Sequence, residues 1–312
     1  MSSSTTANVV SKKVALGADG QELCVHYWNK PTKDTTTPAK STTVFVIYHG
    51  YGAHGLYPTV RYAAELLAND NSRHIVVAAD MRGHGQSPGL KGYIPSVETL
   101  LEDATAVCQH AIDTFTPQHI FLVGSSMGGT IALHVAQKYQ RKHEQQSSSS
   151  STTSITGVLL LAPMLKLSVS SLEQTLLSGL SAIFPQWSVI PSSSTNAEKQ
   201  YRDPLKRQEC EDDPYASKST TMRIGSAHAC VQLAQSIAPE FSHITVPLWI
   251  GVADEDVVVN NQGSLELHAQ AASTDKTLQH YPALHGLLCE PPALVQQIHE
   301  DILAWVHARQ TE

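Results

Sequence analysis

Short runs of apolar residues alternate along this chain with longer stretches in which apolar residues recur every three or four positions. Runs of the first kind are typical of buried strands, and the second spacing predicts helices that bury one face. The predicted strands are Leu23–Trp28, Val44–Tyr48, Ile75–Ala79, Ile120–Val123, Gly157–Leu161, Leu248–Val252 and Leu278–Tyr281. The predicted helices between them are Pro58–Leu67, Ser96–Thr114, Met127–Gln140, Asn261–Ala272 and Pro292–Ala308. Strands that are apolar throughout and alternate with helices predict an α/β fold, with a mostly parallel sheet covered by helices on both faces.

Three stretches depart from this alternation. Thr32–Ser41 is rich in Thr, Pro and Lys and predicts a solvated, hairpin-like connection, and the run of serines within Lys142–Ser154 predicts a mobile connector. The third stretch, residues 165–242, lacks strand-like runs and holds helical patterns at Leu172–Phe184, Ala197–Gln208 and Lys218–Ile237. We interpret it as a helical cap over the strand ends, where α/β proteins place ligands. The predicted organisation is therefore a core in two parts, residues 1–164 and 243–312, interrupted by a cap at 165–242.

Composition and charge exclude several classes of protein. The net charge of −7, with no basic cluster longer than Lys12-Lys13, argues against a nucleic-acid partner. No stretch approaches the roughly 18 apolar residues that span a bilayer. Met1–Val10 has neither the basic start nor the apolar core of a secretory signal. The five cysteines are odd in number and scattered, as expected for reduced thiols. A cytoplasmic location follows as the expectation.

The most informative motif is G-x-S-x-G at Gly124–Gly128. It follows an apolar run that predicts a strand and opens a stretch with helical spacing. A strand that runs into a helix through this motif is a nucleophile elbow. The turn strains the backbone at Ser126 and leaves no room for side chains at the two glycines. Ser126 is therefore the predicted nucleophile, and the backbone N–H of Met127 is a predicted oxyanion donor.

A serine nucleophile needs a base and an acid that orients the base, which on this fold follow it in the order acid, then histidine. Asp254 comes directly after the strand at Leu248–Val252 and is the predicted acid, with Glu255 and Asp256 as competitors. His285 comes directly after the last predicted strand and is the predicted base. His280 lies within that strand and is interpreted as a surface or packing residue.

The second oxyanion donor is expected from a loop after an earlier strand. The loop His49–Gly55 is rich in glycine, and the N–H of Tyr51 is the predicted donor. Asp80 and His84 resemble a second dyad, but both precede Ser126, and a histidine in a glycine-rich turn more often holds a loop together. HExxH, CxxC pairs and phosphate loops are absent from the sequence.

These motifs together resemble the monoacylglycerol lipase and lysophospholipase branch of the α/β-hydrolases, especially its plant-type members. The resemblance runs from about Asp19 to Arg309. Its motifs are His49-Gly-Tyr-Gly52, Asp80-Met-Arg-Gly-His-Gly-Gln-Ser87, Gly92-Tyr-Ile-Pro95, Gly124-Ser-Ser-Met-Gly-Gly129, Pro163-Met164, Asp275-Lys-Thr277 and His285-Gly-Leu-Leu288.

The resemblance implies an α/β-hydrolase fold with Ser126 as nucleophile, Asp254 as acid and His285 as base. It also implies an oxyanion hole made by the N–H groups of Tyr51 and Met127, with no cofactor and no metal. The chain departs from the family at two places. Leu284 stands where similar proteins usually carry an aromatic residue before the histidine, which bears on the shape of the acyl pocket. The Ser-rich connector is also longer than the family's.

The predicted reaction is hydrolysis of a carboxylic ester through an acyl-Ser126 intermediate. A single-chain lipid ester such as a monoacylglycerol is the expected substrate, with Leu176, Leu180 and Leu284 as expected substrate contacts. The apolar residues of the cap also predict peripheral contact with a lipid surface. Alternatives within this class are a lysophospholipase and an esterase for small aromatic (hydroxycinnamoyl-type) esters, and an acyltransferase is an alternative of a different class. A non-catalytic ligand receptor is the alternative of another class, and the oligomeric state is left open. Epoxide hydrolases and dehalogenases are disfavoured because they use Asp in place of Ser126.

Overall fold

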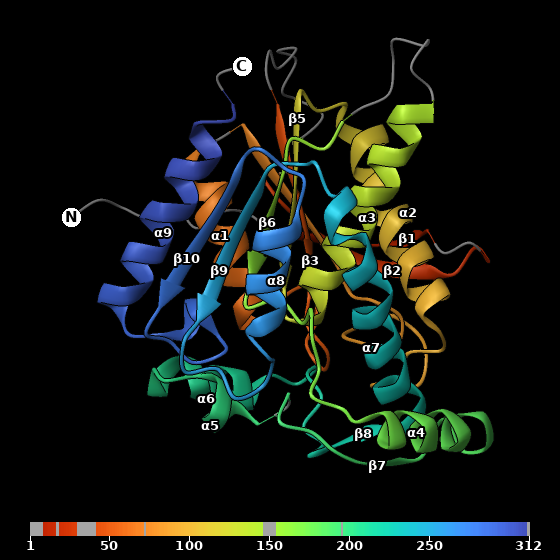
Figure 1. Ribbon diagram of the computed structural model, residues 1–312. Helices are drawn as coiled ribbons and strands as arrows, with labels where there is room; N and C mark the ends of the chain where they lie inside the picture. Colours follow the sequence, from red (N-terminus) through yellow and green to blue (C-terminus); the bar gives the residue numbers. More distant parts are fainter. Residues whose placement is uncertain are drawn as a thin grey trace.

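A central sheet of eight strands organises the molecule (Figure 1). The computed structural model describes residues 9–16, 19–29, 42–71, 73–145, 154–194 and 196–310. The loop predicted at Thr32–Ser41 lies outside these ranges. Of the connector predicted at Lys142–Ser154, only residues 142–145 and 154 lie within them. In spatial order the strands are β1 (Val9–Ala15), β2 (Glu22–Trp28), β4 (His74–Ala79), β3 (Thr43–Tyr48), β5 (His119–Ser125), β6 (Gly157–Leu161), β9 (Leu248–Ala253) and β10 (Lys276–Tyr281).

The sheet is parallel except at one edge. Strands β4, β3, β5, β6, β9 and β10 pair in parallel, whereas β2 runs antiparallel to both β1 and β4. The predicted mostly parallel sheet is therefore confirmed. Strand β1 escaped prediction because its central residues Ser11, Lys12 and Lys13 are polar and exposed, as suits an edge strand that faces water.

Helices cover both faces of the sheet, which confirms the predicted α/β architecture (Figure 1). One apolar layer packs α2 (Val97–Phe115), α3 (Met127–Gln145), α7 (Ile224–Ile237) and α8 (Gln262–Gln270) against the strands. The other layer packs α1 (Pro58–Asp70) and α9 (Pro292–His307) against the opposite face. The core strands consequently bury both of their faces, which explains why their sequences are continuous apolar runs.

The segment between β6 and β9, residues 165–242, is called the cap segment below. It holds α4 (Ser171–Ile183), β7 (Ser188–Pro191), α5 (Ala197–Gln200), α6 (Pro204–Asp212), β8 (Thr221–Arg223), α7 and the 3-10 helix Ala238–His243. In Figure 1, α4, α5, α6 and the β7–β8 pair lie beneath the carboxyl ends of the strands, toward which the arrows of β9 and β10 point.

Two sequence predictions within the cap segment were wrong. The segment contains strands, because β7 and β8 form a small antiparallel sheet. The helix predicted at Ala197–Gln208 is broken, since Asp203 caps a new helix by accepting hydrogen bonds from the N–H groups of Leu205 and Lys206. Pro204 occupies the first turn of that helix, where its missing N–H is tolerated.

Helix α4 is the least buried helix of the cap segment. None of its residues is fully buried, and Leu172 and Ile183 expose 79% and 69% of their surface. Among the helices of the described residues, none is long and apolar enough to cross a membrane.

Candidate active site

Ser126 lies in the tight turn between β5 and α3. Its φ of 55° is in the left-handed region, which costs a non-glycine residue free energy and is found at functional turns. Two backbone hydrogen bonds to the end of β6 and the loop after it hold the strained residue in place. The Ser126 N–H donates to the carbonyl of Leu161 at 3.1 Å, and the Ser126 carbonyl accepts from the N–H of Met164 at 2.9 Å. The structure thus contains the predicted strand–turn–helix elbow.

The two glycines of the motif are required by backbone contacts across the turn. A Cβ atom at Gly124 would lie 2.2 Å from the carbonyl oxygen of Gly128. One at Gly128 would lie 2.0 Å from the carbonyl oxygen of Tyr48 in β3. Both distances are far below van der Waals contact, so helix α3 approaches the sheet this closely only because neither position carries a side chain.

His285 follows β10 and is paired with Asp256. Its Nδ1 lies 2.6 Å from Asp256 Oδ2, and the two side chains are 5% and 0% exposed. The other carboxylate oxygen, Oδ1, accepts from the N–H groups of Val258 and Val259 at 2.7 and 3.1 Å. A buried carboxylate with all of these donors is held in one orientation, and it fixes the tautomer of His285 with the proton on Nδ1.

The prediction that Asp254 is the acid was wrong in this geometry. Asp254 Oδ1 lies 2.7 Å from Nδ1 of His280, and both side chains are about half exposed. The reason is local: the Asp254 N–H still donates to the carbonyl of Tyr281, so this residue continues the β9–β10 ladder and points to the sheet surface. The chain turns only afterwards, where the Asp256 N–H bonds to the carbonyl of Ala253. His280 is a surface residue, as interpreted.

Glu290 connects the histidine loop to the cap segment. Its side chain is buried, and Oε1 accepts from the N–H of Leu284, next to the histidine, at 2.7 Å. Arg202 forms ion pairs with Glu290 Oε2 and with Glu255, each at 2.9 Å. Burial raises the pKa of the Glu290 carboxyl, whereas the Leu284 N–H and Arg202 oppose that rise. Arg202 comes from the cap segment, far along the chain from Glu255 and Glu290, so no local pattern predicted this network.

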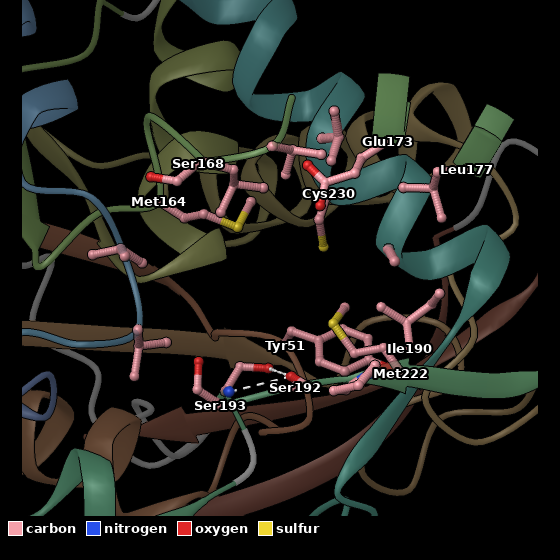
Figure 2. Close-up of a pocket in the computed structure, with 18 of the residues that line it drawn as sticks. Tyr51, Met164, Ser168, Glu173, Leu177, Ile190, Ser192, Ser193, Met222 and Cys230 are labelled. Carbon is pink, nitrogen blue, oxygen red and sulfur yellow. Dashed lines mark hydrogen bonds between the residues drawn. The ribbon is translucent and has the colours of Figure 1, made fainter. Parts of the chain in front are cut away.

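Two cavities meet at Ser126. The first, of about 420 Å³, is mostly apolar and includes Leu176 and Leu180, two of the expected substrate contacts, in its wall. Figure 2 shows side chains entering it from opposite sides, with Met164, Cys230 and Leu177 facing Ile190 and Met222.

The second cavity, of about 380 Å³, is more polar and is lined by Ser126, His285, Gly50 and Tyr51. Leu284 lines neither of the two cavities. Its backbone N–H donates to Glu290, and its predicted contact with substrate stays a prediction.

The glycine-rich loop after β3 lies against the nucleophile. A Cβ at Gly50 would be 3.2 Å from that of Ser126. Within the described residues, the N–H groups of Tyr51 and Met127 have no hydrogen-bond acceptor. His49 stiffens the loop: its Nδ1–H donates to the Gly50 carbonyl at 2.8 Å, and its Nε2 accepts from the N–H of Met81 at 2.9 Å. Burial lowers the pKa of His49 to about 3, so the ring is neutral at pH 7.

Asp80 supports the same loop. It accepts hydrogen bonds from His26 Nε2 at 2.9 Å and from the N–H groups of Gly55 and Gln86, each at 2.7 Å. His84 donates instead to the Arg82 carbonyl, so Asp80 and His84 form no dyad.

The side chains of Cys24, His26 and Asp80 gather their donor atoms within 4.8 Å, the only such group among the described residues that could hold a metal ion. Neighbouring groups already form hydrogen bonds with two of these side chains, His26 and Asp80. Ser11 bonds His26 Nδ1 at 2.8 Å and the backbone bonds Asp80, so the cluster is explained as an internal support.

Comparisons with known proteins identify the family of this chain. The model of the family described as Serine aminopeptidase, S33, matches residues 39–292. Human monoglyceride lipase is 28% identical, covering 94% of this chain and 89% of its own. Caffeoylshikimate esterase of Arabidopsis thaliana is 26% identical, covering 83% of this chain and 75% of its own. The crystal structure of Paleococcus ferrophilus monoacylglycerol lipase is 25% identical, with a TM-score of 0.69, covering 87% of this chain and 98% of that one. The chain therefore belongs to the S33 serine aminopeptidase family and is a serine hydrolase with the α/β-hydrolase fold, similar to the monoacylglycerol lipases.

Proposed function

We propose that this hydrolase cleaves carboxylic esters of single-chain lipids, with monoacylglycerols as the substrate class, through an acyl-Ser126 intermediate. The observation that carries the proposal is the position of Ser126 between an apolar cavity and a polar cavity that also holds His285. A single-chain ester likewise has an apolar part and a polar part. Its acyl chain lies on one side of the carbonyl carbon and its polar alcohol on the other.

The proposed mechanism uses His285 as base and then as acid. Its Nε2 takes the Ser126 proton as Oγ attacks the carbonyl carbon, and it then protonates the departing alcohol. In the second half, His285 activates a water molecule that releases the fatty acid. Asp256 keeps the imidazole proton on Nδ1 and stabilises the imidazolium. The N–H groups of Tyr51 and Met127 are the proposed oxyanion donors, each contributing about 10²–10³ in turnover.

Residues 165–242 are proposed to act as a cap that binds the acyl chain. Leu176 and Leu180 reach the apolar cavity, whereas Leu172, on the same helix, is 79% exposed and is not among its lining residues. The exposed apolar side chains Leu172, Ile183 and Trp187 are proposed to contact a lipid surface. A cap with these two apolar faces would take a single-chain lipid from a membrane and place its ester at Ser126.

The test of the nucleophile is chemical labelling. A fluorophosphonate probe is expected to label the wild-type protein and the Ser125→Ala variant, and to leave Ser126→Ala unlabelled and inactive while its circular dichroism is unchanged. Labelling that persists in Ser126→Ala contradicts the proposed nucleophile. A wild-type protein that hydrolyses none of a panel of monoacylglycerols, lysophospholipids and hydroxycinnamoyl esters contradicts the enzyme proposal and leaves the receptor alternative.

The test of the substrate class is a chain-length series of dissolved monoacylglycerols. Each methylene that leaves water is expected to raise kcat/KM by up to about fourfold until the cavity is filled. Leu180→Asp should reduce long-chain turnover and spare a two-carbon ester, whereas the matched control Leu172→Asp should act like wild type on these dissolved esters. Activity that is flat with chain length, or highest on a bulky aromatic ester, would replace this substrate class with the small aromatic esters.

A further inference from the structure

A third cavity is lined by cations. It lies beside the glycine-rich loop His49–Gly55, which is called the oxyanion loop below because Tyr51 is a proposed oxyanion donor. It measures about 440 Å³, and its wall includes Lys91, Lys218 and Arg223. No aspartate or glutamate is among the described residues that line it. In a protein of net charge −7, a cavity with three cations and no carboxylate is a local reversal of the overall charge. Such a lining favours an anionic ligand.

The cations of this cavity retain free hydrogen-bond donors. Lys218 Nζ has no partner among the described residues, and Lys91 Nζ donates to the carbonyl of Gly85 alone. Arg223 donates from Nε to the Lys91 carbonyl at 2.8 Å and from one terminal nitrogen to the Gln186 carbonyl. Its other terminal nitrogen is unpartnered within the described part of the chain. The two carbonyl contacts fix the guanidinium in the wall, and the unused N–H groups remain available to a carboxylate or phosphate.

Two carboxylates near this cavity, Asp80 and Asp213, direct their oxygens to other donors. Asp80 is engaged by His26, and Asp213 Oδ1 lies 2.9 Å from His54 Nε2 and accepts two backbone hydrogen bonds. His84 also lines the cavity, and burial lowers its pKa to about 4, so it adds no charge at pH 7. The charge of the cavity therefore comes from the two lysines and the arginine.

This cationic cavity adjoins the polar cavity at the nucleophile. Both are lined by Tyr51, Gly52, Ala216, Ser217 and Lys218. The Ser217 N–H donates to the Gly52 carbonyl at 2.8 Å, which joins the cap segment to the oxyanion loop at this boundary. Lys218 is the cation common to both cavities. The polar cavity itself contains Glu198 and Glu211, so an anionic group on the alcohol side is repelled there and attracted beyond Lys218.

We propose that the cationic cavity is a subsite for an anionic group, carboxylate or phosphate, carried by the alcohol part of the ester substrate. The inference rests on the proposed hydrolysis of single-chain lipid esters and adds a preference, within that class, for esters whose alcohol carries an anionic group. Lys218 and Lys91 are its specificity-determining residues, because at most one backbone carbonyl occupies their ammonium groups, whereas two carbonyls hold the Arg223 guanidinium in the wall. The anion takes no part in bond making; it holds the alcohol oxygen in the cavity that His285 lines.

The experiment compares three esters with the same octanoyl chain: the neutral ester of glycerol, the ester of glycerate and the ester of glycerol 3-phosphate. Wild type is expected to favour at least one anionic ester in kcat/KM, and 0.5 M NaCl should reduce that preference by screening. Lys91→Gln combined with Lys218→Gln should lower kcat/KM for that ester by about fivefold per lysine, the upper range for a solvent-accessible ion pair. kcat/KM for the neutral ester should fall by much less, because glycerol carries no charge for the lysines to bind. The glycerate and phosphate arms identify which anion fits.

The matched control is Lys199→Gln, which removes one charge from the cap segment at a position outside the cavity lining and should leave all three rates at wild-type values. Calorimetric binding of glycerol 3-phosphate and glycerate, with glycerol as reference, tests the subsite without turnover. Equal kcat/KM for the three esters, or a double variant that loses no preference, overturns the inference while hydrolysis of the neutral ester stands. Anion binding that depends on the lysines in a protein that hydrolyses no ester supports the subsite and overturns the proposed function instead.

Discussion

Asp256→Asn is expected to lower kcat by about 10⁴, which corresponds to roughly 5.4 kcal/mol of transition-state stabilisation. The structure explains why the loss should be so large. Asp256 Oδ1 accepts from two backbone N–H groups, so an asparagine must place its carbonyl oxygen there and turn its NH₂ group toward His285. Nδ1 then accepts instead of donating, the ring proton moves to Nε2, and His285 no longer accepts the proton of Ser126.

The assay is steady-state hydrolysis of a soluble butyrate ester, with Ser126→Ala as the background and urea unfolding as the check on the fold. Asp254→Asn is the matched control, since it makes the same chemical change two residues away, at an exposed carboxylate that contacts His280. Its activity should stay within a few-fold of wild type. If Asp254→Asn loses as much activity as Asp256→Asn, the reasoning from the hydrogen bond to His285 is refuted.

Further predictions concern the fold and the supports of the site. Gly128→Ala should lower the free energy of unfolding by several kcal/mol in urea titrations, because its Cβ meets the Tyr48 carbonyl. Gly179→Ala in α4 is the control: a Cβ at this position has no atom within 4 Å, so the variant should be neutral or more stable by up to about 1 kcal/mol. Glu290→Gln keeps an acceptor for the N–H of Leu284, which precedes His285. This variant should therefore retain a higher kcat than Glu290→Ala, with similar KM values in both. Burial holds the pKa of His84 near 4 in the fold, below its usual 6.5, so its stabilising contribution is present above about pH 6.5 and lost as the pH falls toward 4. Urea midpoints between pH 7 and 4.5 should therefore fall, and His84→Gln should flatten that slope by about 1 kcal/mol per pH unit.

The sequence was sufficient for the features that depend on neighbouring residues. The elbow at Ser126 was predictable because the strand, the turn glycines and the helix are contiguous, and each imposes its own residue types. The core strands were predictable because a parallel strand buried on both faces must be apolar throughout. The cap segment was predicted less well. Short exposed strands such as Thr221–Arg223 have too few residues to display a period, and the break at Asp203 depends on a capping contact.

The acid of the site illustrates what periodicity alone does not determine. Asp254 and Asp256 share the same loop and the same parity, so both would face one side if the strand simply continued. The β9–β10 ladder continues through Asp254, and the following turn then reverses the direction of the chain before Asp256. The alternation of side chains along the strand therefore no longer predicts which way a side chain points within two residues of the strand end. The choice between the two carboxylates depends on that turn and on the N–H groups of Val258 and Val259 that hold Asp256, which are contacts rather than patterns. For the same reason the cationic cavity was not predictable from the sequence. Lys91 and Lys218 are separated by more than a hundred positions and come together only because the cap segment folds onto the loop His49–Gly55.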